Sequence, residues 1–248
     1  MSLKDQIIPE KLPSHVAVIM DGNGRWARQR GMDRIFGHRQ GVNAVREIIE
    51  CAAELGIAYL TLYAFSTENW DRPDDEVSAL MGIMVQSLTD ETDTLVRNNI
   101  RFTAIGNIER LDEDVREKLL ETIALTSGAT GLNLIVAMSY SSRWEITEAT
   151  KKISEDVKAG LIDTDSINEN IITRYLATYG VPDPELMIRT SGELRISNFL
   201  LWQLAYTELY FTDILWPDFG KKDFYTAIIE FQNRERRFGK TGEQVSDK

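Results

Sequence analysis

The chain has 248 residues, of which 43% are hydrophobic and 27% charged, and its 39 acidic and 28 basic side chains give a formal net charge of −11. This composition is typical of a soluble globular chain and excludes a disordered, collagen-like or disulfide-stapled protein. The net acidity argues against nucleic-acid binding, because phosphate contacts need clustered lysine and arginine, which leave such domains basic.

Apolar runs and helical patterns alternate in chain order. Short apolar runs predict buried strands at residues 16–20, 57–65, 100–105, 132–138, 186–189 and 208–211. Apolar residues at helical spacing predict helices at residues 41–55, 73–97, 112–126, 143–158, 166–178, 199–206 and 222–238.

This alternation predicts one α/β domain with a mainly parallel, six-stranded central sheet flanked by helices. No repeat, low-complexity segment or Pro/Gly-rich linker in the sequence marks a second domain. Residues 1–13 and 240–248 are expected to be flexible tails. Because ligands of such sheets bind beyond the carboxyl ends of the strands, the functional residues are expected there.

Cysteine usage and hydropathy indicate the compartment. Cys51 is the only cysteine, so an intramolecular disulfide is impossible, and a buried thiol in a reducing compartment is expected. No apolar run reaches about 18 residues, and the N-terminus lacks the basic start and apolar core of a signal peptide. These features predict a cytoplasmic protein.

The first predicted strand ends in a turn suited to phosphate. Its sequence is Asp21-Gly22-Asn23-Gly24-Arg25-Trp26. The two glycines allow a tight turn whose backbone amides point at an anion. Between residues 22 and 46, six arginines accompany a single acid, and the planar arginine fork suits a diphosphate. Arg25 is expected to contact the ligand, whereas Arg28, Arg30 and Arg46 are more simply explained as a solvated face.

Asp21 is the first candidate for metal binding. A carboxylate beside a bound diphosphate would be repelled unless Mg²⁺ lay between them, although the same aspartate could instead cap its own turn. Glu208, at the start of the last predicted strand, is a possible second metal ligand. His38 lies close to the arginines and could bind phosphate or carry a proton.

Two further loops repeat this chemistry. Residues 66–73 follow the second strand, and residues 189–197 follow the fifth; both combine arginine with hydroxyl and amide groups. Together they suggest two anionic groups bound in one crevice. The helix at 73–97 carries Val77, Leu80, Met81, Met84, Leu88 and Leu95 at helical spacing. That stripe is either core packing or one wall of a tunnel for an apolar chain.

These motifs resemble one family. Residues 15–26, 36–38, 62–70, 72–73, 188–193, 195–203, 208–212, 216–217 and 233–238 are similar, in this order, to the motifs of the cis-prenyltransferases, and among them to those of bacterial undecaprenyl diphosphate synthases. The resemblance covers nearly the whole chain. It implies an α/β fold with a hydrophobic tunnel.

The resemblance also implies an activity. The family adds isopentenyl diphosphate repeatedly, in cis and with Mg²⁺, to an allylic diphosphate such as farnesyl diphosphate. The expected product is a long polyprenyl diphosphate, undecaprenyl diphosphate, which serves as a carrier lipid for cell-wall glycans. A homodimer is implied, with product release at the membrane surface and peripheral association with its inner face.

Residue roles are implied by position within the matched motifs. Asp21 would bind Mg²⁺ and be essential, with Glu208 as a metal ligand. The allylic diphosphate would be held by Gly22, Asn23, Gly24, Arg25, Trp26, Arg34 and His38. A mobile loop of Ser66, Thr67, Glu68, Asn69, Trp70 and Arg72 would close over the substrates. Isopentenyl diphosphate would be held by Arg189, Arg195, Ile196 and Ser197. Asn69 is implied as proton acceptor, but a neutral amide is a poor base, so positioning by Asn69 and proton transfer to a diphosphate oxygen is the alternative.

Two other function classes compete. Gly22-x-Gly24-x-x-Ala27 formally matches a dinucleotide fingerprint, but the interval where an acid should end the next strand is a predicted helix, so an NAD-dependent oxidoreductase is not supported. A non-catalytic accessory subunit of the same fold remains an alternative, against which the retained Asp21 and Asn69 argue.

Overall fold

Six short apolar segments pair into a single sheet in the computed structural model, which describes residues 2–236. The strands are β1 (His15–Ile19), β2 (Tyr59–Ser66), β3 (Arg101–Ile105), β4 (Asn133–Tyr140), β5 (Leu186–Arg189) and β6 (Glu208–Phe211). Their order is β3-β4-β2-β1-β5-β6, and every neighbouring pair is parallel. The predicted single α/β domain with a parallel six-stranded sheet is confirmed.

Seven α-helices connect or follow the strands in the described residues. They are α1 (Asn23–Gln29), α2 (Arg34–Leu55), α3 (Asp74–Arg97), α4 (Glu113–Thr126), α5 (Ser142–Lys158), α6 (Glu169–Tyr175) and α7 (Lys221–Gln232). Short 3-10 helices are η1 (Lys4–Gln6), η2 (Pro9–Lys11), η3 (Thr67–Asp71), η4 (Ile108–Arg110), η5 (Thr164–Ser166) and η6 (Trp216–Asp218). Within residues 2–236, no helix is long and apolar enough to cross a membrane.

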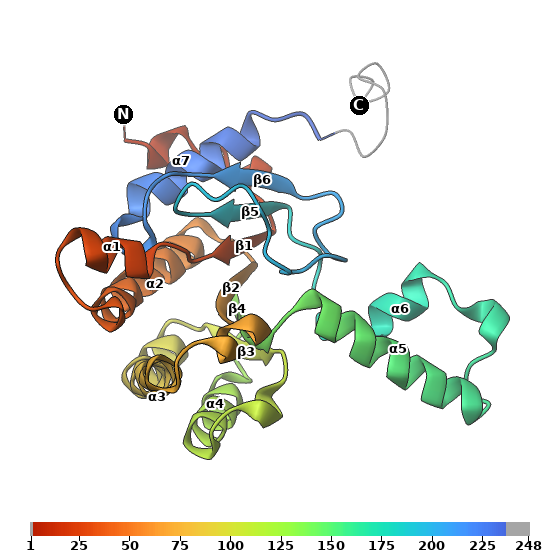
Figure 1. Ribbon diagram of the computed structural model, residues 1–248. Coiled ribbons are helices and arrows are strands. Elements are labelled where there is room, and N and C mark those ends of the chain that lie inside the picture. Colours follow the sequence, from red (N-terminus) through yellow and green to blue (C-terminus); the bar gives the residue numbers. More distant parts are fainter. Residues whose placement is uncertain (1, 237–248) are drawn as a thin grey trace.

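Both faces of the sheet are buried. Side chains alternate along β1, so that Val16 and Val18 join the larger core cluster while Ala17 and Ile19 join the smaller one. Helices α2, α3, α4 and α7 cover the larger cluster, whereas α5 and α6 extend away from the sheet on the other side (Figure 1). Burial on both faces explains why the strands read as continuous apolar runs in the sequence.

The predicted helix at 199–206 is wrong. This segment consists of bends and turns; Asn198, just before it, and Leu200, within it, have φ values of 61° and 46°. A right-handed helix cannot start from that backbone. The apolar residues that suggested a helix, Phe199, Leu200 and Leu204, instead fill the smaller core cluster.

The helix predicted at 41–55 begins earlier, at Arg34. The apolar helical spacing is clear only from Gly41 onward, whereas Gly37 and Gly41 serve close packing against α1. A Cβ atom on Gly37 would lie 2.0 Å from the backbone oxygen of Asn23, and one on Gly41 would lie 2.4 Å from Asn23 Oδ1. The glycines therefore let α1 cross α2 at short range.

The end of the last helix also differs from the sequence prediction. The last helix ends at Gln232 rather than at residue 238, and residues 237–238 lie outside the described part of the chain. The predicted tail at 240–248 lies outside it as well. Near the N-terminus, the Ile8 backbone accepts from and donates to the Gln232 side chain, at 2.8 and 3.1 Å, so this segment is attached to α7.

Candidate active site

The carboxyl ends of three neighbouring strands meet at one edge of the sheet. β1 lies between β2 and β5, with Ile19 in register with Tyr63 on one side and Arg189 on the other. Where the connections from neighbouring parallel strands run in opposite directions, a crevice forms at the carboxyl edge of the sheet. Asp21 follows β1 by two residues, Ser66 ends β2 and Arg189 ends β5. The structure thus brings together the three segments that the sequence singled out.

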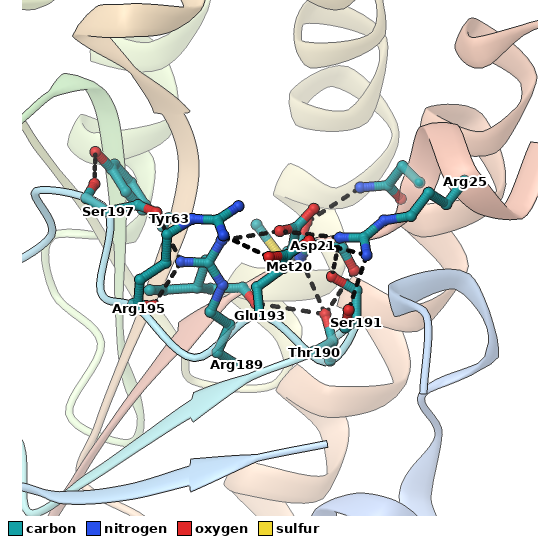
Figure 2. A network of polar contacts seen from close by, with 12 residues as sticks. Met20, Asp21, Arg25, Tyr63, Arg189, Thr190, Ser191, Glu193, Arg195 and Ser197 are labelled. Carbon is teal, nitrogen blue, oxygen red and sulfur yellow. Dashed lines mark hydrogen bonds and ion pairs between the residues drawn. The ribbon is translucent and has the colours of Figure 1, made fainter. Parts of the chain in front are cut away.

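Asp21 is held by a threonine and two arginines (Figure 2). Its backbone N–H donates to Thr190 Oγ1 at 2.9 Å, and its backbone oxygen accepts from that hydroxyl at 2.6 Å. Oδ2 accepts from Arg189 Nη2 at 2.9 Å and lies 3.5 Å from Arg25 Nη2. Burial acts to raise the pKa of Asp21, but the Arg189 hydrogen bond and the charges of both arginines hold this pKa below its usual value. Asp21 is therefore ionised at neutral pH.

The side chain of Arg189 is buried, only 4% exposed. Its Nη1 donates to the Arg195 carbonyl at 2.6 Å and to Ser197 Oγ at 2.7 Å. Its Nε is buried and has no hydrogen-bond partner among the described residues. Because buried donors are nearly always paired, this N–H fits a bound acceptor such as a phosphate oxygen.

Arg25 reaches from the first turn of α1 to the loop after β5. It donates to the Ser191 carbonyl at 2.9 Å and to Ser191 Oγ at 2.5 Å, and its Nη1 lies 3.0 Å from Glu193 Oε1. Glu193 also pairs with Arg195 through its other oxygen. Figure 2 shows Arg25 and Arg189 on opposite sides of Asp21. Two arginines from distant parts of the sequence thus converge on one carboxylate.

The polar segment after β2 forms the 3-10 helix η3. Its cap is reciprocal, and the Ser66 backbone N–H donates to Asn69 Oδ1 at 3.0 Å. Asn69 therefore uses its carbonyl oxygen within the helix cap, which favours a positioning role over proton acceptance. Trp70 packs against Phe65 with ring centres 5.1 Å apart, and its Nε1 donates to Ser139 Oγ at 2.9 Å. Trp70 thereby anchors η3 to the sheet.

A second basic group surrounds Glu76 at the start of α3. Glu76 Oε1 lies 3.0 Å from Arg72 Nη1 and 3.2 Å from Arg34 Nη2. Burial, followed by the charge of Arg72, lowers the pKa of His38 from 6.5 to about 4, with Arg34 adding to the effect and Glu76 opposing it. His38 is thus neutral near pH 7 and can donate one N–H without carrying a charge.

A cavity of about 770 Å³ opens at this edge of the sheet. It is lined by nine of the predicted site residues: Asp21, Asn23, His38, Ser66, Glu68, Asn69, Arg72, Arg189 and Ser197. Its interior wall is mainly apolar and comes from α2 (Val42, Val45, Ile49), from α3 (Leu80, Ile83, Met84, Leu88, Leu95) and from the sheet region (Leu62, Ile100, Phe102, Leu134, Val136). The cavity therefore joins a charged mouth to an apolar interior.

The apolar stripe of α3 contributes both to the core and to the wall of the cavity, through different residues. Leu80, Met84, Leu88 and Leu95 line the cavity, whereas Val77 and Met81 are buried in the core without lining it. Arg46, which was expected on a solvated face, forms an ion pair with Glu91 of α3, and both residues line the cavity.

The remaining predicted site residues do not line the cavity. They are Gly22, Gly24, Arg25, Trp26, Arg34, Thr67, Trp70, Arg195, Ile196 and Glu208. Arg25, Arg34 and Arg195 still belong to the charged mouth through the ion pairs above. Trp26 instead faces Asp218, to which its Nε1 donates at 2.7 Å, and Arg30 lies 3.9 Å from the centre of its ring. The prediction that Trp26 binds substrate is not supported by this placement.

Glu208 lies away from the cavity mouth. It begins β6 in register with Leu186, at the amino ends of these strands, whereas Asp21 lies beyond the carboxyl ends. Three strand residues, about 10 Å, separate Glu208 from the edge where the site forms. Its Oε2 pairs instead with Arg234 Nη1 at 3.2 Å. Within one chain, Glu208 and Asp21 therefore lie at opposite edges of the sheet, and the role of Glu208 as a metal ligand stays a prediction.

Comparison with known proteins decides the family. Residues 19–239 match the family model described as putative undecaprenyl diphosphate synthase. The chain belongs to the undecaprenyl diphosphate synthase family. It is accordingly a cis-prenyltransferase, and the sequence resemblance is confirmed.

Curated members of the family match the chain along almost its full length. An isoprenyl transferase of Porphyromonas gingivalis is 53% identical over 235 residues, which cover 95% of this chain and 92% of that protein. A ditrans,polycis-undecaprenyl-diphosphate synthase of Vibrio vulnificus, named as specific for (2E,6E)-farnesyl diphosphate, is 48% identical over 240 residues, covering 97% and 96%.

Solved structures of family members share the fold. Lavandulyl diphosphate synthase from Lavandula x intermedia, crystallised with dimethylallyl diphosphate, has a TM-score of 0.91 and 40% identity, covering 93% of this chain and 100% of that one. A probable undecaprenyl diphosphate synthase from Campylobacter jejuni has a TM-score of 0.77 and 37% identity, covering 92% and 99%.

The donor set of this family member suits magnesium. No group of three or more His, Cys, Asp or Glu residues able to hold a metal occurs in residues 2–236. Mg²⁺ characteristically takes one or two carboxylates and completes its shell with water and substrate phosphate. The ionised, partly exposed Asp21 at the cavity mouth fits that pattern, whereas a zinc site would need several protein ligands.

Three residues at the cavity were missed in the sequence. Tyr63, Arg143 and Asn198 all line it. Arg143 follows β4 closely, so the rule that ligands meet strand ends would have identified it. Tyr63 reads as an ordinary buried strand residue, and its neighbour in space, Phe199, stacks on it with ring centres 4.3 Å apart. Asn198 lay within a matched motif but had no assigned role.

Proposed function

We propose that the protein elongates farnesyl diphosphate by repeated cis addition of isopentenyl diphosphate, with undecaprenyl diphosphate as its product. The observation that carries this proposal is the cavity, which has cationic groups and Asp21 at its mouth and an apolar interior between the sheet, α2 and α3. A substrate with a diphosphate head and an isoprenoid tail matches both parts. The named specificity of the Vibrio vulnificus relative supports farnesyl diphosphate as primer.

The charged mouth divides into two groups that suit two diphosphates. Asn23, Arg25, Arg34 and His38 come from α1 and α2 and would hold the allylic diphosphate. Arg189, Arg195 and Ser197 come from β5 and the following loop and would hold isopentenyl diphosphate. Binding in this way aligns the two reacting carbons and converts a bimolecular encounter into an oriented one.

Catalysis requires stabilisation of the departing diphosphate. As the allylic C–O bond breaks, negative charge accumulates on the diphosphate oxygens, and fixed arginine and backbone donors lower the energy of that state. Mg²⁺, when bound at Asp21, would supply additional positive charge to the same oxygens. Asn69 would position the substrates, because its oxygen is engaged by Ser66, and a diphosphate oxygen would take the proton released on forming the new double bond.

The biological setting of the proposal follows the family. The product would serve as the carrier lipid for cell-wall glycans. The protein would work as a homodimer in the cytoplasm and release its product at the inner face of the membrane. Support for these statements is the full-length similarity to isoprenyl transferases.

The test is turnover with defined substrates. Purified protein is incubated with farnesyl diphosphate, labelled isopentenyl diphosphate and Mg²⁺, and the product length and double-bond geometry are analysed. We expect long products with cis double bonds in every added unit. Products that are all-trans, or no product with any allylic primer, would overturn the proposal and would favour a non-catalytic accessory subunit.

The role of Asp21 is tested by Asp21→Ala and Asp21→Asn. Both should reduce Mg²⁺-dependent turnover by about 100-fold or more, because the ionised oxygen at the diphosphate is lost. Asp21→Asn removes the negative charge but keeps an oxygen that can accept the hydrogen bond from Arg189. A comparison of the two variants therefore separates the effect of the charge on turnover from the effect of this hydrogen bond. Asp93→Ala, on the exposed side of α3, is the matched control and should leave turnover unchanged. Unaltered turnover in Asp21→Ala would contradict the metal role.

A further inference from the structure

Asn198 joins three segments that surround the cavity mouth. Its Nδ2 donates to Glu68 Oε1 of η3 at 2.8 Å. Its Oδ1 accepts from the Arg143 backbone N–H at 3.0 Å, and its backbone oxygen accepts from the Ser142 N–H at 2.8 Å. These two amides belong to the first turn of α5, where backbone donors lack partners within the helix.

The three segments follow three different strands. η3 follows β2, α5 follows β4, and the Asn198 segment follows β5. Each carries a residue that lines the cavity: Asn69, Arg143 and Ser197. Asn198 therefore ties η3, the loop expected to close over the substrates, to α5 and to the segment to which isopentenyl diphosphate is assigned.

The local backbone is adapted to this junction. Ser197 and Asn198 have φ values of 47° and 61°, a region that asparagine tolerates better than most residues. Ser197 Oγ accepts from Arg189 at 2.7 Å, so the backbone next to Asn198 is also fixed by the buried guanidinium. A displacement of Asn198 would move Ser197 away from that position.

We propose that Asn198 is a positioning residue that couples η3 to the Ser197 segment through its hydrogen bond to Glu68. The proposal rests on the proposed function, since it assigns Asn198 a part in holding η3, the loop expected to close over the substrates, in register with the segment that would hold isopentenyl diphosphate. Asn198 acts through Asn69 and Ser197 rather than on the reacting atoms.

The environment of Glu68 is consistent with this coupling. Burial acts to raise the pKa of Glu68, but the Asn198 hydrogen bond and bonds from the Ser66 and Thr67 side chains keep this pKa below its usual value. Glu68 is thus ionised and needs a donor. Asn198 Nδ2 supplies a donor that lies on another segment.

The Asn198→Asp substitution isolates this one bond. The aspartate retains an oxygen to accept from the Arg143 amide, and a negative charge at the first turn of α5 is favourable for the helix dipole. Only the donor to Glu68 is lost, and a carboxylate now faces another carboxylate. We expect kcat/KM for both substrates to fall about 10-fold to 100-fold, while the thermal midpoint falls by no more than about 5 °C, because the helix-dipole gain offsets part of the repulsion between the two carboxylates.

A second substitution should restore the coupling. In the double variant Asn198→Asp with Glu68→Gln, the glutamine amide can donate to the aspartate, so the bond is re-formed with donor and acceptor exchanged. We expect the double variant to recover at least about tenfold of the lost kcat/KM. Lowering the pH from about 8 to about 6 should also raise the relative activity of the single variant, because two adjacent carboxylates share a proton more readily.

A readout without turnover separates this proposal from the proposed function. Hydrogen exchange of the backbone amides at residues 66–71 should accelerate in Asn198→Asp, while those of α5 keep their protection. Asn43→Asp, with the same charge change on the exposed side of α2, is the matched control and should alter neither exchange nor kcat/KM.

Two results would contradict the coupling of η3 to the Ser197 segment. An Asn198→Asp variant with unchanged exchange at residues 66–71 would overturn the coupling, as would a double variant no more active than the single one. If the unmodified protein shows no turnover with any allylic primer, the proposed function fails, and the exchange measurement alone decides whether Asn198 holds η3 in place.

Discussion

At the scale of single residues, the site neutralises its own charges before any ligand arrives. Asp21 accepts from Arg189, Glu193 holds Arg25 and Arg195, and Glu76 holds Arg34 and Arg72. An entering diphosphate must therefore replace carboxylates as the partner of the arginines. Such an exchange lowers affinity but keeps the arginine side chains ordered, so less conformational entropy is lost on binding.

His15 provides a residue-level prediction about pH. It is 1% exposed, and its ring nitrogens contact the Pro182 carbonyl at 2.6 Å and Thr61 Oγ1 at 2.7 Å. Burial lowers the pKa of His15 from 6.5 to about 4, against smaller opposing effects of Pro182 and Glu185. The unfolded chain then binds a proton in a range where the folded chain does not. The free energy of unfolding should therefore decrease as the pH falls from about 6.5 to about 4, by up to about 3 kcal/mol from this group.

Urea unfolding at a series of pH values measures this decrease. His38, whose pKa is also about 4, should add to it, so His15→Gln is expected to flatten only part of the slope while lowering stability at pH 7. Carboxylates with lowered pKa values, such as Asp21 and Glu185, also stabilise the folded chain. Their contribution is lost only as the pH falls below the ordinary carboxyl pKa, at the acid end of this series. A free energy that stays constant between about pH 6.5 and about pH 4.5 would contradict the role given to His15.

At the scale of elements, the contact of α1 with α2 depends on glycine. A Cβ atom at Gly37 would lie 2.0 Å from the Asn23 backbone oxygen, so Gly37→Ala must push α1 away from α2. We expect a loss of about 1 to 3 kcal/mol in the free energy of unfolding. Turnover should fall as well, because α1 carries Arg25 toward Asp21.

Gly82 in α3 is the matched control for that substitution. A Cβ atom there would meet no atom within 4 Å, so Gly82→Ala should stabilise the helix by about 0.5 to 1 kcal/mol and raise the thermal midpoint by about 1 to 4 °C. Differential scanning calorimetry of both variants checks the pair. If Gly37→Ala were as stable as Gly82→Ala, the close approach of the two helices would not matter for stability.

The elements also show which features the sequence can specify. Runs such as Val16 to Ile19 predict strands well, because burial on both sheet faces leaves a continuous apolar signal. The start of α2 was missed because the apolar helical spacing begins only at Gly41, and the packing role of Gly37 depends on the crossing with α1. The turns around Asn198 and Leu200 were missed because left-handed backbone leaves no periodic trace in sequence.

The same limits apply to the site. Asp21 and Arg189 were predicted correctly to share one edge, because both sit at carboxyl ends of apolar strands. Glu208 sits at the start of its strand, so the same rule places it at the opposite edge of the sheet, away from Asp21. The coupling by Asn198 depends on how three loops meet, which only the folded chain defines.

At the scale of the whole molecule, the net charge of −11 and the anionic substrates are compatible because charge is unevenly placed. Arginines from α1, α2, β5 and the loop after β5 gather at the carboxyl edge. The cavity leaves that edge and reaches Leu95, Ile100 and Phe102 near the start of β3. It thus extends along the five residues of a strand, about 17 Å, which is room for a tail to lengthen inside the molecule.

Filling this interior should shorten the product. Ser87 of α3 lines the cavity, and its hydroxyl donates to the Ile83 carbonyl of its own helix at 2.8 Å, so Ser87→Phe removes no bond between elements and only adds volume. We expect Ser87→Phe to accumulate shorter polyprenyl diphosphates while the rate of the first addition changes less than about twofold, because the charged mouth lies elsewhere. Chromatography of labelled products gives the length distribution.

Ser154→Phe is the control, since Ser154 makes the same kind of bond to the Thr150 carbonyl on the exposed side of α5. Its replacement should leave product length unchanged. Identical product lengths in Ser87→Phe and the unmodified protein would mean that the growing chain does not occupy this cavity.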